Sequence, residues 1–158
     1  MSDIIFMLTL AAVLGSGIVA GIFYAFSSFI MGALGKLPSH EGIAAMQSIN
    51  IVVINPVFFL AFFGTAALSL VLGGYAVLNW VVEGSALLLF GALFYLVGCI
   101  LVTMIFNVGL NNQLAKVEPA SPDGAAMWKH YLVAWTMWNT VRTVAPSVSV
   151  VLFVLAMV

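Results

Sequence analysis

Charged side chains are scarce in this sequence. Lys, Arg, Asp and Glu together make up 6% of the 158 residues, whereas a soluble domain typically has about 25%. The formal net charge is -1, so nothing in the charge balance indicates a nucleic-acid partner. The composition excludes an ordinary soluble domain and predicts an integral membrane protein.

The residues that form disulfides and metal sites are also few. Cys99 is the single cysteine, which excludes an internal disulfide. Two histidines, without paired carboxylates inside the apolar runs, do not make a di-iron or haem site. The eight methionines lack the short regular spacing of a copper site, and no phosphate loop, Ser-His-Asp set or nucleotide fingerprint occurs. We therefore expect neither a metal nor a cofactor.

Long apolar runs fill most of the chain, and 65% of its residues are hydrophobic. A helix needs about 20 apolar residues to cross a bilayer, and four runs reach that length. They predict an all-α fold, an antiparallel four-helix bundle formed by one transmembrane domain over residues 1–158. We expect spans at about 4–34, 51–72, 85–106 and 131–157, with polar loops at 35–50 and 107–130.

The few basic residues are distributed unevenly between the ends of these runs. Lys36 lies in the first loop, Lys116 and Lys129 lie in the third connection, and the second connection and both termini have no Lys or Arg. The positive-inside rule then places loops 35–50 and 107–130 in the cytoplasm and both termini outside. Asp3 is the only charge before the first run, so the basic segment of a signal peptide is missing and we expect this run to be retained.

One cation interrupts the fourth run. Arg142 lies in the stretch Trp135–Pro146, which is otherwise suited to a bilayer. A charge at mid-membrane costs roughly 2.5–3.5 kcal/mol on insertion scales, so such a residue normally faces the bundle interior and has a partner. The carboxylates all lie near the ends of the apolar runs or between them: Asp3, Glu41, Glu83, Glu118 and Asp123. Either amides, backbone carbonyls and water solvate Arg142, or it binds an anionic ligand.

Amide and aromatic side chains recur on the faces expected to surround this cation. Asn139 and Trp135 precede Arg142 by three and seven residues and share its helical face. Asn55 precedes Pro56, where it either satisfies the backbone that proline leaves unpaired or lines a site. The pattern predicts a funnel that opens to the cytoplasmic leaflet and ends at Arg142, suited to a flat, partly apolar molecule with a negative oxygen. The candidate substrate-binding residues are Asn50, Asn55, Asn107, Asn111, Trp135 and Trp138.

Four motifs extend this pattern over nearly the whole chain. They are Gly21–Ser28, Met46–Phe58, Phe106–Leu114 and Trp135–Thr143. Together they resemble the DUF1772, or anthrone oxygenase-like, family of four-span membrane proteins. The chain departs from the family at Gly109, where the family often has proline, and at Thr140, where it often has a histidine that would be a candidate base.

The resemblance implies a cofactor-independent oxidoreductase, a monooxygenase that oxidises an anthrone to an anthraquinone. Its partners would be the lipid bilayer, dioxygen and a small lipophilic aromatic substrate, and its location a bacterial inner membrane. Deprotonation of such a substrate gives a carbanion that can pass an electron to dioxygen directly. The catalytic candidates are Arg142 and Asn139, with Asn107, for the oxyanion, and His130 or Tyr24 as the base.

Two other functions are compatible with the same residues. The chain could be a non-enzymatic protein that binds or transports a small lipophilic anion, or Arg142 and the amides could serve only to hold the bundle together. The Phe and Leu side chains of the outer faces suit lipid or a second copy equally, which leaves a homo-oligomer open.

Overall fold

The computed structural model describes residues 2–158, and within them it contains helices and no strand. The first long helical segment runs through α1 (Asp3–Ala25), the π-helical turn η1 (Phe26–Ile30) and α2 (Met31–Leu34). The second is α4 (Pro56–Leu78). The third comprises α5 (Ser85–Leu93), η2 (Phe94–Leu101), η3 (Thr103–Asn107) and α6 (Val108–Leu114), and the fourth is α7 (Pro122–Ala156). A shorter helix, α3 (Ser39–Val52), connects the first two.

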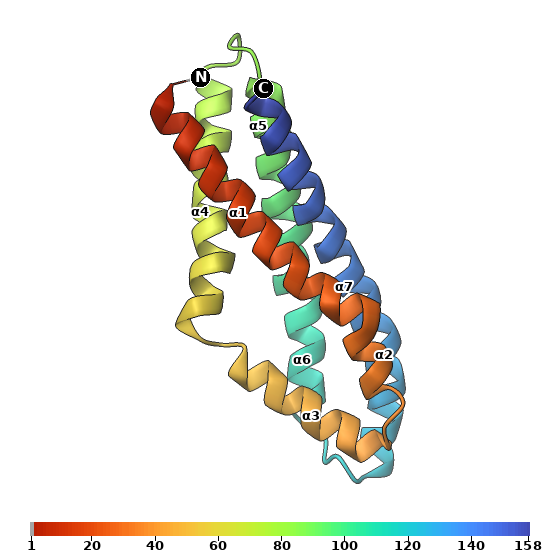
Figure 1. Cartoon of the computed structure of the whole chain (residues 1–158). Coiled ribbons are helices and arrows are strands. Elements are labelled where there is room, and N and C mark those ends of the chain that lie inside the picture. The colour runs from red at the N-terminus through yellow and green to blue at the C-terminus, as the bar shows by residue number, and fades with distance from the viewer. Residues whose placement is uncertain (1) are drawn as a thin grey trace.

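These four segments form an up-and-down bundle in which both termini lie at one end (Figure 1). α1 packs on α4 and α7, and α5 packs on α4 and α7. All four are long and apolar enough to cross a membrane. The predicted all-α four-helix fold is confirmed, and the chain has the helices of an integral membrane protein. Its orientation in the membrane stays a prediction.

Helical structure differs from the expected spans at the end of the bundle opposite the termini. α3 and α6 occupy most of the first predicted loop and the start of the second, and α7 begins at Pro122, ahead of the predicted span. α3 lies across this end of the bundle (Figure 1). It approaches α7 closely at Gly42, where a Cβ atom would lie 2.7 Å from Cζ2 of Trp128. The end that carries the polar loops is therefore closed by a helix.

The second span begins at Pro56, because Asn55 ends the preceding turn and caps α4. The Asn55 Oδ1 atom accepts a hydrogen bond from the Phe58 amide at 3.0 Å, and its Nδ2 atom donates to the Val52 carbonyl at 3.0 Å. Proline suits the first position of a helix, where its missing N–H is not needed. Asn55 therefore has the backbone role, and it also lines a cavity between α1 and α4.

The interior contains three clusters of buried side chains stacked along the bundle. The cluster nearest the termini contains Ile5, Ala12, Leu72, Ala76, Leu88, Ala92 and Phe153. The middle cluster contains Val19, Phe23, Phe62, Ala66, Tyr95 and Cys99. The cluster beside α3 contains Met31, Ile43, Met46, Leu110, Leu114, Trp128, Tyr131 and Trp135. Large apolar side chains also cover the outside, as expected for a surface in lipid.

Candidate functional site

Arg142 points into the bundle, between the middle cluster and the cluster beside α3. Its side chain is 6% exposed. The guanidinium carbon lies 4.0 Å from the centroid of the Phe23 ring and 4.8 Å from that of the Trp135 ring. A guanidinium over aromatic faces gains about 0.5–2 kcal/mol, depending on its desolvation. Two aromatic rings therefore form much of the wall around this cation.

Side-chain oxygens supply the hydrogen bonds of this guanidinium. Nε donates to Oδ1 of Asn139 at 3.0 Å, and Nη1 lies 3.5 Å from Oγ1 of Thr103, at the long limit of a hydrogen bond. Among residues 2–158, no carboxylate forms an ion pair with Arg142, and the one ion pair found joins His40 and Glu41 at the start of α3. The site is therefore a buried positive charge held by neutral groups.

Asn139 fixes this arrangement to the first helix. Its Oδ1 atom accepts from Arg142, while Nδ2 donates to the Phe23 carbonyl and to Oγ of Ser27, each at 2.7 Å. Both polar atoms of this amide thus have partners, one on α7 and two on the first helical segment. These bonds orient the amide and hold the guanidinium over the Phe23 ring.

A second set of amides positions the aromatic residues of α7. Asn111 Oδ1 accepts from the Tyr131 hydroxyl at 2.7 Å and from Nε1 of Trp135 at 2.8 Å. Asn50 Nδ2 lies 3.4 Å from the same hydroxyl. Asn107 Nδ2 donates to the Trp135 carbonyl at 3.2 Å. Three of the predicted binding residues therefore hold Trp135 and Tyr131 in place, and through Trp135 they shape the wall beside Arg142.

The side-chain oxygen of Asn107 is one of several buried polar atoms among residues 2–158 that have no hydrogen-bond partner. Asn107 is fully buried, and within the described part of the chain its Oδ1 atom has no hydrogen-bond donor. A buried acceptor without a donor typically costs about 1–3 kcal/mol, so such atoms usually bind a water or a ligand group. Asn107 thus offers an acceptor within the same layer as Trp135.

We expect Asn111→Leu to lower the thermal stability of the protein. The substitution keeps the side-chain volume but leaves the Tyr131 hydroxyl and the Trp135 indole N–H without their acceptor, and each buried donor costs about 1–3 kcal/mol. Thermal melting in detergent measures the loss. Asn112→Leu is the matched control, because Asn112 is exposed on the same helix; equal melting temperatures of the two variants would contradict the network.

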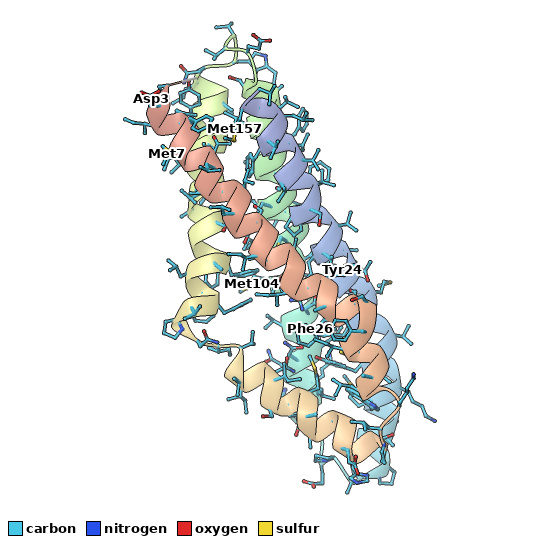
Figure 2. All side chains as sticks on the ribbon, in the orientation of Figure 1. Asp3, Met7, Tyr24, Phe26, Met104 and Met157 are labelled. Atoms are coloured by element: carbon cyan, nitrogen blue, oxygen red, sulfur yellow. The ribbon has the colours of Figure 1, made fainter. Side chains whose placement is uncertain are left out.

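The two predicted bases lie outside this site. Tyr24 is 63% exposed on the outer side of α1 (Figure 2), and His130 is exposed near the start of α7. Successive residues of a helix point about 100° apart, so only one of two neighbours can face the interior. Phe23 and Tyr131 occupy the inward positions, and their neighbours therefore point outward.

The remaining predicted binding residues lie beside the site. Trp138 stacks on Phe106 with ring centroids 3.6 Å apart, whereas the rings at the guanidinium are those of Phe23 and Trp135. The expected funnel toward α3 is filled by the cluster beside that helix, in which Trp128, Tyr131 and Trp135 stack at 5.8 Å and 5.7 Å. A cavity of 730 Å³ opens instead between α1 and α4. Sequence reasoning missed this cavity and the role of Phe23, since a single phenylalanine in an apolar run carries no signal.

π-Helical turns surround the layer that contains Arg142. Ser27 lies in η1, Cys99 in η2, and Thr103 and Asn107 in η3. π-Helical turns are rare and occur frequently at functional sites, because the inserted residue redirects side chains that a regular helix would place elsewhere. Four residues near Arg142 therefore lie in π-helical turns, which is why we treat this layer of the bundle as the candidate site.

Comparison with known proteins connects this layer to a family. The model of the anthrone oxygenase family matches residues 58–152, more than half of the chain. The match includes Thr103, Asn107, Asn139 and Arg142. No curated protein and no solved structure matches the chain. The resemblance inferred from the motifs is confirmed, and the chain belongs to the anthrone oxygenase family.

Proposed function

We propose that this protein is a membrane oxygenase that converts an anthrone-like, enolisable aromatic substrate to a quinone without a cofactor. The observation that carries the proposal is the Arg142 guanidinium, which is 6% exposed and donates to Asn139 and Thr103, while no carboxylate among the described residues forms an ion pair with it. An unpaired buried charge destabilises a fold. A cation kept under these conditions is suited to an anion that forms on a bound substrate.

The anion would form on the substrate. An anthrone has a CH₂ group between two aromatic rings, opposite a carbonyl, and loss of one proton delocalises the charge onto the carbonyl oxygen. A charge-assisted hydrogen bond from Arg142 to that oxygen favours the ionised form. The guanidinium itself cannot accept a proton. Because Phe23, Trp135, Thr103 and Asn139 are not bases either, the proton would pass to a water molecule in the site and from there to bulk water.

The oxidation then needs only dioxygen. The anion gives one electron to dioxygen, and the resulting radical and superoxide combine to form a carbon–oxygen bond. Protonation gives a hydroperoxide, which loses water together with the second CH₂ proton and leaves a carbonyl. The net reaction consumes one dioxygen, turns CH₂ into C=O and releases one water. The aromatic walls around Arg142 would keep bulk water from the radical pair, and the bilayer would concentrate both reactants.

A second function is the binding or transport of a small lipophilic anion without chemistry. The observation that favours it is the location of Tyr24 and His130, which places both predicted bases away from Arg142. The two functions share the same anion site and differ in the use of dioxygen.

The test is oxygen uptake by the protein in lipid nanodiscs supplied with anthrone and ¹⁸O₂. We expect one dioxygen consumed per anthrone and one ¹⁸O atom in each anthraquinone, at a rate well above that of empty nanodiscs, which corrects for spontaneous oxidation. Saturable binding of the anthrone anion with oxygen uptake equal to that of empty nanodiscs would assign the protein to anion binding or transport.

A further inference from the structure

A cavity forms a groove between α1 and α4, and Arg142 is not among the residues that line it. Its volume is 730 Å³, within the range of about 300–1,000 Å³ typical of small-molecule sites. The residues that line it are Ala11, Gly15, Ile18, Ile22, Val53, Asn55, Val57, Phe58, Leu60, Ala61, Gly64, Thr65 and Leu68. α1 and α4 diverge toward the α3 end of the bundle, where the turn after α3 completes the groove (Figure 1).

The lining of the groove suits a neutral apolar molecule. Most of the lining side chains are aliphatic or aromatic. The amide of Asn55 is engaged by the cap of α4, where both of its polar atoms bind backbone groups. An anion in this groove would have no cation beside it, since none of the lining residues is charged. The groove can therefore hold a substrate before ionisation and not after it.

Two phenylalanines connect the groove to the cation. Phe58 lines the groove, and its ring contacts the Phe23 ring edge to face, with centroids 6.5 Å apart and an angle of 63°. The same Phe23 ring lies 4.0 Å from the guanidinium carbon of Arg142. Phe58 and Phe23 therefore lie between the groove and the charge, and Phe62 packs against both rings.

We propose that the α1–α4 groove binds the neutral form of a flat polycyclic aromatic substrate that enters sideways from the bilayer, and that Phe58 and Phe23 separate this form from the ionised form at Arg142. The inference rests on the proposed function for the identity of the substrate. The physical basis of the inference is that the two forms of the substrate differ in solubility. A neutral aromatic molecule dissolves in the hydrocarbon of a bilayer, whereas its anion does not. The groove and the guanidinium would then act in sequence.

The test narrows the groove from each wall and compares each variant with a matched control. Gly64→Phe adds a ring where a Cβ atom would meet only Leu60, at 3.7 Å, and Gly74→Phe adds the same ring on α4 where nothing lies within 4 Å. Ile18→Trp adds an indole from α1, and Leu14→Trp is its control; the native side chains are 57% and 61% exposed. Because the two walls are changed separately, misfolding of one variant does not remove the test.

The first measurement is photolabelling of the full chain in phosphatidylcholine nanodiscs with 2-azidoanthracene, which cannot ionise, followed by peptide mass spectrometry. We expect labels on groove residues of α1 and α4 that excess anthracene prevents. Labelling should fall about tenfold or more in Gly64→Phe and Ile18→Trp, a change equivalent to at least about 1.4 kcal/mol of binding. It should be unchanged in both controls and in Arg142→Met.

The second measurement is the kinetics of anthrone oxidation. Filling the groove should raise KM about tenfold and leave kcat within about twofold, because the groove acts before the chemical step. Equal labelling in all five variants would mean that the groove holds lipid only, which overturns the inference. Labelling that behaves as expected in a wild-type protein without oxygen uptake would leave the groove established and reject the proposed oxygenase.

Discussion

Replacing Arg142 with methionine is expected to reduce anthrone-dependent oxygen uptake by at least about a hundredfold, the loss typical of removing one donor from an oxyanion site. Methionine fills a similar length and can still pack between Phe23 and Trp135, so the wall of the site persists. What disappears is the charge that favours the substrate anion. Oxygen-electrode kinetics in nanodiscs give the loss directly.

Arg142→Lys separates the charge from its geometry. Lysine keeps the cation but has no planar group to lie over the Phe23 ring while also donating to Asn139. We therefore expect turnover to be lost in this variant too. Full activity of Arg142→Lys together with Arg142→Met would exclude this site as the place of catalysis.

Thermal melting of the same variants separates catalysis from a purely structural role. Removal of a buried cation that lacks an ion pair, and its replacement by an apolar side chain, is often neutral or stabilising. The loss of contact with two rings opposes this by about 0.5–2 kcal/mol. A small change in melting temperature with a large loss of turnover is expected. A large drop in melting temperature, with no ligand able to shift it, would instead mean that Arg142 only holds the bundle together.

The sequence was enough to predict what the membrane imposes. Apolar runs of about 20 residues must become spanning helices, and a charge inside one of them must face the interior. Once Arg142 faces inward, its spacing from Asn139 and Trp135 brings all three to the same helical face, and the structure has them in contact. These predictions depend on energies of several kcal/mol and on local periodicity.

The predictions that were wrong depend on how each helix is rotated about its own axis. These helices are apolar on all sides. In a soluble helix a polar stripe indicates which face is buried, but in the first span both faces consist of similar residues. The sequence alone does not show whether Phe23 or Tyr24 faces Arg142. At the start of α7 it likewise does not show whether His130 or Tyr131 faces the interior. The π-helical turns and the α1–α4 groove arise from packing between helices and have no local sequence signal.

The most discriminating variant adds an anion instead of removing the cation. Thr103 Oγ1 lies 3.5 Å from Nη1 of Arg142, so the carboxylate of Thr103→Asp would reach the guanidinium. Hydrogen bonds to charged groups contribute about 1.5–3 kcal/mol, and the buried cation would gain its missing counter-ion. We expect the melting temperature to rise by a few degrees while oxygen uptake falls to the level of Arg142→Met.

Higher stability together with lower activity in Thr103→Asp would indicate that Arg142 binds an anion during turnover. A cation with a purely structural role would have no reason to remain without a counter-ion. Thr103→Asn is the control, since it has the shape of aspartate without the charge and should change neither property strongly. In the double variant with Arg142→Met the new carboxylate lacks its partner, and the stabilisation should become a loss, which measures the coupling of the pair. Retained turnover in a stabilised Thr103→Asp protein would mean that the substrate anion does not bind at Arg142.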